Sequence, residues 1–325
     1  YSHNMICHLG VYRRDLVEEI GGFREGIEGA QDYDLALRFI ERIDGTAIQH
    51  IPRVLYHWRR HPGSTTRGLT EKPYAIEAGR NALQEHFGRQ GIAASIEGTP
   101  TGNHVRYALP AEPPLVTLII PTRNGYPLLR DCIDSILEKT TYPNYELLIV
   151  DNGTDEHETI DYLKQLAGKS NLCVRRDDRP FNFAALNNAA VKQARGELVA
   201  LVNDDVEVIT PDWLTEMVRL ALQPGVGAVG AKLLYPNGNI QHAGVVLGLG
   251  GVAGHAFKLI PGEDSGYHFR AQLTSSFSAV TAACLLIRKH IYLEVGGMEE
   301  KNLSIAFNDV DFCIRVRETG LRNVW

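Results

Sequence analysis

The sequence predicts an α/β fold in which a central, mostly parallel sheet is flanked by helices. Between residues 114 and 222, short apolar runs typical of buried parallel strands alternate with longer segments of helical periodicity. The composition, with 44% hydrophobic and 22% charged residues, is that of a globular chain and excludes a disordered or fibrous one. The strand–helix order favours crossover connections, which place successive strands parallel in one sheet.

Each expected element rests on its own pattern. Residues 115–122 (LVTLIIPT) are a nearly continuous apolar run, whereas residues 126–139 carry leucine and isoleucine at helical spacing. Ligands of such sheets bind beyond the carboxyl ends of the strands. The remaining expected strands are 146–150, 172–175 and 198–202, and the remaining helices are 156–167, 184–195 and 213–222.

An internal repeat links the two ends of the chain. Residues 13–23 resemble residues 288–298 at a shift of 275, and residues 31–38 resemble residues 308–315 at a shift of 277. A period this long does not fit a solenoid but suits two copies of a whole domain. The alternative is a coincidence between amphipathic helices, although a glycine pair, an acidic pair and an arginine recur in the same order.

The repeat and the composition together predict the domain organisation. The fold then includes a partial second copy at the N-terminus, because residues 1–66 form the C-terminal part of a preceding domain. Residues 67–113 are expected to be a linker with one helix, since they carry one amphipathic segment followed by a stretch rich in glycine, proline and threonine. Residues 114–325 form the second domain without its C-terminal tail.

The charge of the chain argues against a nucleic-acid-binding protein, and its cysteine content indicates a reducing compartment. The chain has 33 Lys plus Arg against 39 Asp plus Glu, a net charge of −6, which argues against nucleic-acid binding. Its five cysteines never form a C-x-x-C pair, as expected in the reducing cytoplasm. No apolar stretch reaches the ~20 residues of a membrane span, and no signal peptide is visible. The first residue is not methionine, and we expect a piece of a longer protein.

Polar side chains follow three of the expected strands. Asp204 and Asp205, after Asn203, suit Mg²⁺ or Mn²⁺, although a turn or helix cap explains the same residues equally well. Asp151 suits a base or ribose contact, with a helix cap as the favoured alternative. Residues 121–124 suit a nucleotide contact or a simple turn. No glycine-rich phosphate loop is present, which disfavours a dinucleotide dehydrogenase, a P-loop NTPase and a nucleotidyltransferase.

Three further residues suggest proton transfer or metal binding. Asp309 opens an amphipathic segment, where it is either a general base or an acid stabilised by the helix dipole. Asp32 is its counterpart in the repeat. His57 lies among aromatic residues, where a structural role is the usual one and completion of a metal site is the alternative.

Five segments together resemble glycosyltransferase family 2, the inverting nucleotide-sugar transferases with a GT-A-like nucleotide-binding fold. The stretch from Trp213 through residues 227–230 and 240–244 looks like the bacterial branch that builds O-antigen and other surface polysaccharides, including rhamnosyltransferases. Each motif alone is weak, but their order along the chain and their places at strand ends make the resemblance specific. The segments are 121–124 (PTRN), 146–153 (ELLIVDNG), 180–188 (PFNFAALNN), 196–206 (GELVALVNDDV) and 308–315 (NDVDFCIR).

The resemblance implies roles for individual residues. Asp309, and Asp32 in the first copy, match the catalytic base, while Asp205 and His57 match the metal ligands of their respective copies. Asn203 stands where the family's D-x-D motif has its first aspartate, which leaves a non-catalytic nucleotide- or sugar-binding module as the alternative function. The nucleotide-sugar would be bound by Pro121, Thr122, Asn124, Asp151, Asn182, Asn188 and Asp204.

The resemblance also implies the reaction and its partners. A divalent cation, Mg²⁺ or Mn²⁺, would neutralise the leaving nucleoside diphosphate while the base deprotonates an acceptor hydroxyl. The expected partners are a nucleotide-diphospho-sugar donor and a glycan or lipid-linked glycan acceptor, with no nucleic acid. The expected location is cytoplasmic, with possible peripheral contact with the inner face of the membrane during surface-polysaccharide synthesis.

Overall fold

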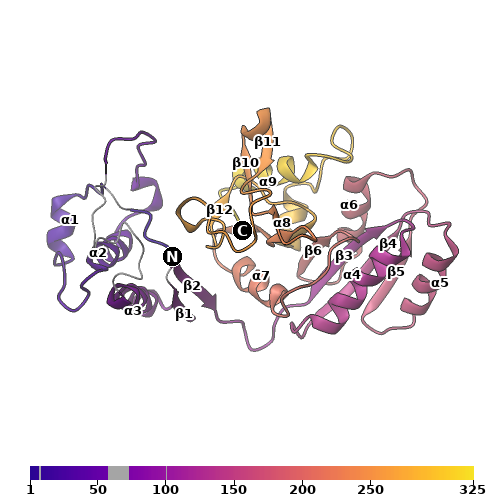
Figure 1. The fold of residues 1–325 in the computed structure, drawn as a ribbon, viewed down its shortest axis with the longest axis horizontal. Helices are drawn as coiled ribbons and strands as arrows, with labels where there is room; N and C mark the ends of the chain where they lie inside the picture. Colours follow the sequence, from indigo (N-terminus) through magenta and orange to yellow (C-terminus); the bar gives the residue numbers. More distant parts are fainter. Residues whose placement is uncertain (7–8, 58–72, 100) are drawn as a thin grey trace. The chain divides into compact units, whose positions relative to one another are not determined.

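A computed structural model describes residues 1–6, 9–57, 73–99 and 101–325 (Figure 1). The chain divides into two compact units. Unit 1 contains Tyr1–Ala108 and Ser265–Thr274, and unit 2 contains Leu109–Asp264 and Ser275–Trp325. Each unit has a hydrophobic core of its own.

Unit 2 is built on an eight-stranded sheet with the order β12-β14-β7-β13-β6-β3-β4-β5. The strands expected from the sequence, β6, β3, β4 and β5, are parallel neighbours, which confirms that prediction. The strand β13 is antiparallel to both β6 and β7, while β14 is parallel to β7. The strands are β3 (Val116–Thr122), β4 (Tyr145–Asp151), β5 (Leu172–Arg176), β6 (Leu198–Val202), β7 (Val226–Gly230), β12 (Ser276–Phe277), β13 (Cys284–Arg288) and β14 (Arg322–Val324).

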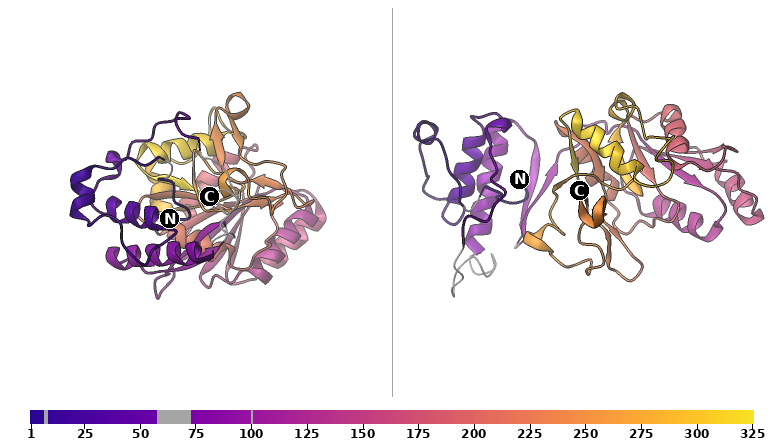
Figure 2. Two further views of the ribbon diagram at one scale, coloured as in Figure 1. Left: turned by 60° about the vertical axis from the view of Figure 1, so that its left-hand side comes forward. Right: turned by 90° about the horizontal axis from the view of Figure 1, so that it is seen from above.

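Helices cover both faces of this sheet (Figures 1 and 2). All seven residues of β3 and all five of β6 are buried, as expected for strands covered on both sides. Helices α4, α5 and α7 share one core cluster on one face, whereas α6, α8 and α9 lie together on the other. The helices are α4 (Tyr126–Lys139), α5 (His157–Leu166), α6 (Phe183–Gln193), α7 (Trp213–Ala221), α8 (Lys289–Glu294) and α9 (Asn308–Glu318).

Short strands outside the main sheet complete unit 2. The sequence analysis assigned no strand beyond residue 202, because these runs of two to five residues are too short to show a period. The β10–β11 hairpin, with a 3₁₀ turn at Leu249–Gly251, lies beside the carboxyl end of β6 and lines the cavity described below. These strands are β8 (Leu233–Leu234), β9 (Ile240–His242), β10 (Val245–Leu247) and β11 (Ala253–His255).

Unit 1 is a small helical body with one hairpin. Helices α2 and α3 pack against each other, and the hairpin of β1 and β2 packs on α3. The part of the expected linker up to Ala108 therefore belongs to this unit, and α3 supplies much of its core through alanine, leucine and phenylalanine. The elements are α1 (Arg14–Glu19), α2 (Gln31–Ile40), a 3₁₀ turn (Gly45–Ala47), α3 (Pro73–Gln90), β1 (Ala94–Thr99), β2 (Gly102–Tyr107) and a 3₁₀ turn (Tyr267–Phe269).

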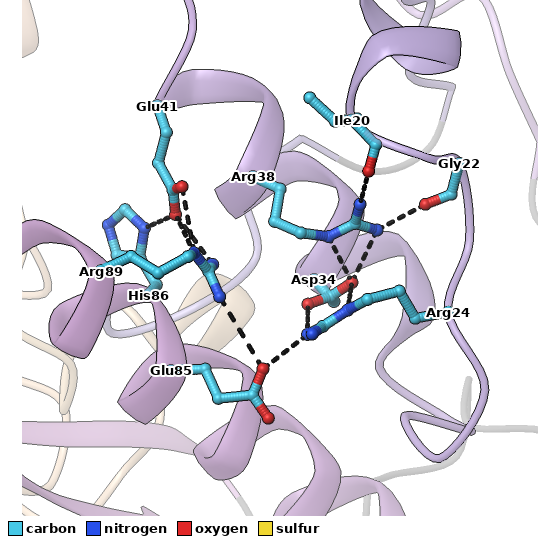
Figure 3. Close-up of polar contacts among 9 residues, drawn as sticks. All are labelled: Ile20, Gly22, Arg24, Asp34, Arg38, Glu41, Glu85, His86 and Arg89. Atoms are coloured by element: carbon cyan, nitrogen blue, oxygen red, sulfur yellow. Dashed lines mark hydrogen bonds and ion pairs between the residues drawn. The ribbon is translucent and has the colours of Figure 1, made fainter.

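A buried ion cluster holds the helices of unit 1 together (Figure 3). The carboxylate of Asp34 accepts hydrogen bonds from Arg38, over 2.9 Å, and from Arg24. Arg38 also donates to the carbonyl oxygen of Ile20 over 2.7 Å, and so ties α2 to the end of α1. Burial by itself raises the pKa of Asp34, but the bonds from the two arginines outweigh it and lower the pKa below its usual range.

In the part of the chain that the structure describes, no helix combines the length and the apolar character needed to cross a membrane.

Candidate active site

Asp204 and Asp205, the acidic pair, lie where the sheet predicts a ligand site, at the carboxyl ends of β3 and β6. The hydroxyl of Thr122 donates to Oδ2 of Asp204 over 2.7 Å, so the last residue of β3 positions the first acid after β6. Burial raises the pKa of Asp204, the bond from Thr122 lowers it, and the negative charge of Asp205 raises it again; the pKa ends above its usual range. The side chain of Asp205 is exposed and free to face a ligand.

Asp151, the last residue of β4, is buried and already has protein partners. Its Oδ1 accepts from the backbone N–H of Thr154 over 2.9 Å, and its Oδ2 accepts from Arg176 over 2.8 Å. The side chain thus closes a turn in the loop after β4, whereas the N-cap of α5 is Glu156. The proposed base or ribose contact stays a prediction, in which Arg176 would hold the carboxylate in place.

The loop after β3 is shaped by Asn124. Its backbone has a φ of +58°, a left-handed conformation that asparagine tolerates better than most residues. Its side chain donates to Asp155 over 2.8 Å and accepts from the backbone N–H groups of Asp155 and Glu156. Pro121 is buried inside β3, opposite Val150 of β4. Both residues thus set the course of the loop beside the acidic pair.

Asn182 and Asn188 of the 180–188 segment tie α6 to the loop after α8. Asn182 is the N-cap of α6, accepting from the N–H of Ala185 over 2.9 Å, and it donates to the carbonyl of Glu300. Asn188 is buried, with Oδ1 accepting from the hydroxyl of Tyr292 (2.6 Å) and the N–H of Met298 (2.8 Å). Its Nδ2 donates to the carbonyl of Met298 and to Glu300, so these partners account for both ends of the amide.

A cavity of about 340 Å³ brings Asp309 and Asn203 together. Asn203 directly precedes the acidic pair, and Asp309 is the second residue of α9. Oδ2 of Asp309 accepts from the N–H of Ala282 over 3.1 Å, and Oδ1 accepts from the N–H of Val310. These bonds fix the carboxylate at the cavity wall, where it can still accept a proton from a bound hydroxyl.

A pair of histidines, His242 and His255, lies at this cavity without having been predicted from the sequence, and of the two only His255 lines the cavity. His255, at the end of β11, lines the cavity, and its Nδ1 lies 2.8 Å from Nδ1 of His242, which is fully buried. His242 stood in one of the segments that resembled the bacterial branch, but nothing in the spacing of thirteen residues predicted the pairing. The available signal in the sequence was a histidine within the segment 240–244 (IQHAG).

Asp32 and His57 belong to unit 1. Asp32 lies in the first turn of α2, where its Oδ2 accepts from the side chain of Asn4 over 3.2 Å. His57 is the last described residue before the gap, and its side chain is exposed. Their predicted roles belong to the first copy and stay predictions.

The repeated segments have matching local structures in the two units. Helices α1 and α8 each end in two glycines with positive φ, and helices α2 and α9 each carry an Asp–Arg pair one turn apart. In both pairs, Asp34–Arg38 and Asp311–Arg315, the Asp–Nε distance is 2.9 Å. Each arginine also donates to the carbonyl of the C-cap residue of the preceding helix.

The family model for "Glycosyl transferase family 2" matches residues 117–292, more than half of the chain and nearly the whole α/β core of unit 2. The chain belongs to glycosyl transferase family 2. This membership confirms the resemblance drawn from the five segments, all but the last of which lie within the matched residues.

Two curated relatives extend the likeness of this family 2 chain over its whole length. It is 55% identical over 328 residues to "Uncharacterized protein y4gI" of Sinorhizobium fredii, and 39% identical over 325 residues to "O-antigen biosynthesis protein RfbC" of Myxococcus xanthus. The matches cover 100% and 99% of the chain, but the chain spans only 36% and 25% of the lengths of these relatives.

The fold is shared with a solved structure. The structure "GalNAc-T7 with UDP, GalNAc and Mn2+" superposes on 68% of the chain and 43% of its own, with a TM-score of 0.51 and 13% sequence identity. This likeness concerns the fold alone, and it confirms the GT-A-like α/β architecture expected from the sequence.

Proposed function

We propose that this family 2 chain transfers a sugar, with inversion, from a nucleotide-diphospho-sugar to a hydroxyl of a glycan or lipid-linked glycan acceptor. One observation carries the proposal: Asp309 and Asn203, the residue before the acidic pair, line one cavity. A base and a diphosphate site must face the same sugar for a single displacement to occur. The similarity to "O-antigen biosynthesis protein RfbC" supports a surface polysaccharide as the product. The sugar that we propose for transfer is a hexose or rhamnose.

The chemistry of the proposed site needs one proton acceptor. Asp309 takes the proton of the acceptor hydroxyl, the oxygen forms a bond to the anomeric carbon, and the bond to the nucleoside diphosphate breaks on the opposite side. The configuration at the anomeric carbon is therefore inverted. Thr122, Asp151 and Asn182 are the residues that we propose for binding and orienting the nucleotide, either directly or through their loops.

The acidic pair suits a divalent cation, Mg²⁺ or Mn²⁺. Asp204 and Asp205 offer the hard oxygen ligands that these ions prefer. Burial and then the charge of Asp205 raise the pKa of Asp204, and a bound cation would oppose both effects. No group of three or more histidine, cysteine or acidic side chains poised for a metal ion occurs among the described residues, so donor phosphate oxygens would complete the coordination. When bound, the cation would neutralise charge on the leaving diphosphate.

A test of the proposal is Asp309→Asn in the purified chain. Transfer from a panel of radiolabelled UDP-, GDP- and dTDP-sugars should fall by about 10²- to 10⁴-fold, because the substituted amide cannot accept the hydroxyl proton. Nucleotide binding, measured as a thermal shift with Mn²⁺, should persist. The matched control is Asp161→Asn, on the exposed surface of α5, which should leave transfer unchanged.

Two results would overturn the proposal. Transfer by Asp309→Asn at the rate of the unchanged chain would exclude Asp309 as the base. Nucleotide binding without transfer by the unchanged chain would favour the alternative function, a non-catalytic nucleotide- or sugar-binding module, which the asparagine at position 203 in place of an acid supports.

We also propose that unit 1 contains the C-terminal part of a second glycosyltransferase domain. The matching Asp–Arg pairs and glycine turns of the two units support this, and they make Asp32 the counterpart of Asp309. His57 would then be a metal ligand of that first copy. In a longer protein that carries a complete first domain, Asp32→Asn should abolish a second, separable transfer activity.

The proposed location is the cytoplasm, with peripheral contact with the inner membrane face when the acceptor is lipid-linked. Flotation of the chain with liposomes, with and without a polyprenyl-linked glycan, tests this. Flotation only in the presence of the glycan is the expected result, and its absence in both would remove the membrane contact from the proposal.

A further inference from the structure

Two histidines meet at the wall of the proposed active site. The Nδ1 atoms of His242 and His255 lie 2.8 Å apart, and the rings are perpendicular, with centroids 5.0 Å apart. His242 is fully buried, whereas His255 is partly exposed and lines the cavity that contains Asp309. The steps of the proposed reaction given above use neither residue.

The hydrogen bonds determine which nitrogens carry protons. Nε2 of His242 lies 3.4 Å from the backbone nitrogen of Thr281, which can only donate, so this Nε2 is an acceptor and carries no hydrogen. A neutral His242 must then carry its proton on Nδ1, and this Nδ1–H donates to Nδ1 of His255. A neutral His255 in turn carries its own proton on Nε2. The opposite assignment would set the Thr281 N–H against a second donor.

Both rings are held neutral. Burial, and to a smaller extent the neighbouring His255, lowers the pKa of His242 to about 3. Burial also lowers the pKa of His255, as does the positive charge of Lys258, while the carboxylate of Asp309 acts in the opposite direction. The charged groups that act on this pair are thus Lys258 and Asp309, and neither produces an imidazolium at neutral pH.

We propose that His255 is a substrate-binding residue whose Nε2–H, fixed in place by His242, donates to an oxygen of a sugar in the cavity of Asp309. This inference rests on the proposed function, because it needs a sugar in that cavity. The residue would bind and orient the sugar, and His242 would act as a positioning residue through it.

The neutral state suits this place in the site. An imidazolium beside Asp309 would pair with the carboxylate and reduce its ability to accept a proton, whereas a neutral N–H donor leaves the base free. Sugars present hydroxyl oxygens together with apolar C–H faces, and the cavity combines this donor with the aromatic side chains of Phe181, Phe183 and Phe307. A mostly apolar cavity with a few fixed polar groups is typical of a small-ligand site.

The first experiment reads the protons directly. The full chain, labelled with ¹⁵N-histidine, is examined by long-range ¹H–¹⁵N correlation at pH 7, and the two residues are assigned from His242→Asn and His255→Gln. We expect His242 protonated at Nδ1 only and His255 at Nε2 only. A His255 protonated at Nδ1, or at both nitrogens, would overturn the inference, whether or not the chain transfers sugar.

The second experiment tests the sugar contact. His255→Phe keeps a ring but removes the donor, and kcat/KM for transfer should fall roughly tenfold, the loss expected for one hydrogen bond to substrate. His255→Gln, whose amide can place an N–H near the position of Nε2, should recover most of it. His157→Phe, a matched change on the exposed surface of α5, should have no effect.

The outcomes separate the two proposals. If His255→Phe and His255→Gln both transfer like the unchanged chain, the sugar contact is wrong while the proposed function stands. If both lose activity equally while their thermal stability falls, the role of His255 is structural. If the unchanged chain shows the expected protons but no transfer from any donor, the proposed function fails and takes the sugar contact with it.

Discussion

Gly297→Ala tests how the structure holds the loop that leads to Asp309. Gly297 has a φ of +74°, and a Cβ added there would lie 2.4 Å from Oδ1 of the buried Asn188. The neighbouring Gly296 has a φ of +84° but no atom within 4 Å of an added Cβ. Alanine at either position incurs the left-handed backbone penalty, about 1 kcal/mol, but only Gly297→Ala must displace the asparagine.

The cost of that displacement follows from the bonds of Asn188. Its Oδ1 accepts from Tyr292 over 2.6 Å and from Met298 over 2.8 Å, and its Nδ2 donates to Met298 over 2.8 Å. At about 1 kcal/mol for each buried hydrogen bond, their loss adds about 3 kcal/mol. We therefore expect Gly297→Ala to lower the free energy of unfolding by about 4 kcal/mol, against about 1 kcal/mol for Gly296→Ala.

Urea denaturation of both variants, followed by circular dichroism, measures this difference. Because Asn188 was predicted from the sequence as a sugar-binding residue, the pair of variants also shows how far it serves as a structural link. Equal losses of stability for the two variants would refute the reasoning, since they would mean that the asparagine adjusts at no cost. If the two variants lose stability but keep their transfer activity, the position of this loop does not affect the reaction.

Three further predictions concern charge and metal. Asp34→Asn should destabilise the chain by about 3 kcal/mol at pH 7 by leaving Arg38 buried without its carboxylate. The pKa of Asp34 is lower in the folded chain than in the unfolded chain, where it is about 3.9. The ionised carboxylate therefore stabilises the fold above about pH 3.9, and this stabilisation is lost as the pH falls through the folded pKa. Denaturation measured from pH 7 to pH 3 should show an acid-sensitive loss of stability that Asp34→Asn lacks. Thr122→Val should weaken donor binding about tenfold in calorimetry by removing the bond to Asp204, and an unchanged affinity would contradict that role. Chelation with EDTA should abolish transfer and Mn²⁺ should restore it; activity that survives EDTA would remove the cation from the mechanism.

The parallel half of the sheet could be predicted because burial on both faces leaves a direct signal. The strands β3 and β6 are nearly continuous apolar runs, and the helices between them have full turns of periodic pattern. The other half, of mixed strand direction, could not be predicted, because strands such as β12, with two residues, owe their existence to pairing with β14 rather than to their own sequence. Tertiary contact, not local preference, decides such short elements.

The candidate site likewise contains residues that could be predicted from the sequence and residues that could not. The acids at strand ends could be found because topology fixes where strands end, and the bond from Thr122 to Asp204 is a consequence of that shared edge. The pairing of His242 with His255 depends on how β9 and β11 lie beside each other. No periodicity encodes that contact, so the structure was needed to find it.

The two units share a structural feature, an Asp–Arg pair that links two successive helices. In unit 2, Asp311 and Arg315 tie the start of α9 to the end of α8, and Asp309 stands in the turn that this link holds. In unit 1 the Asp34–Arg38 pair ties α2 to α1 in the same way, with Asp32 in the corresponding turn. The repeated element is thus a frame that fixes an acid at the start of a helix. A catalytic base must keep its distance to the acceptor hydroxyl constant within a fraction of an ångström. Such a base needs a frame of this kind more than a helix that serves only for packing does.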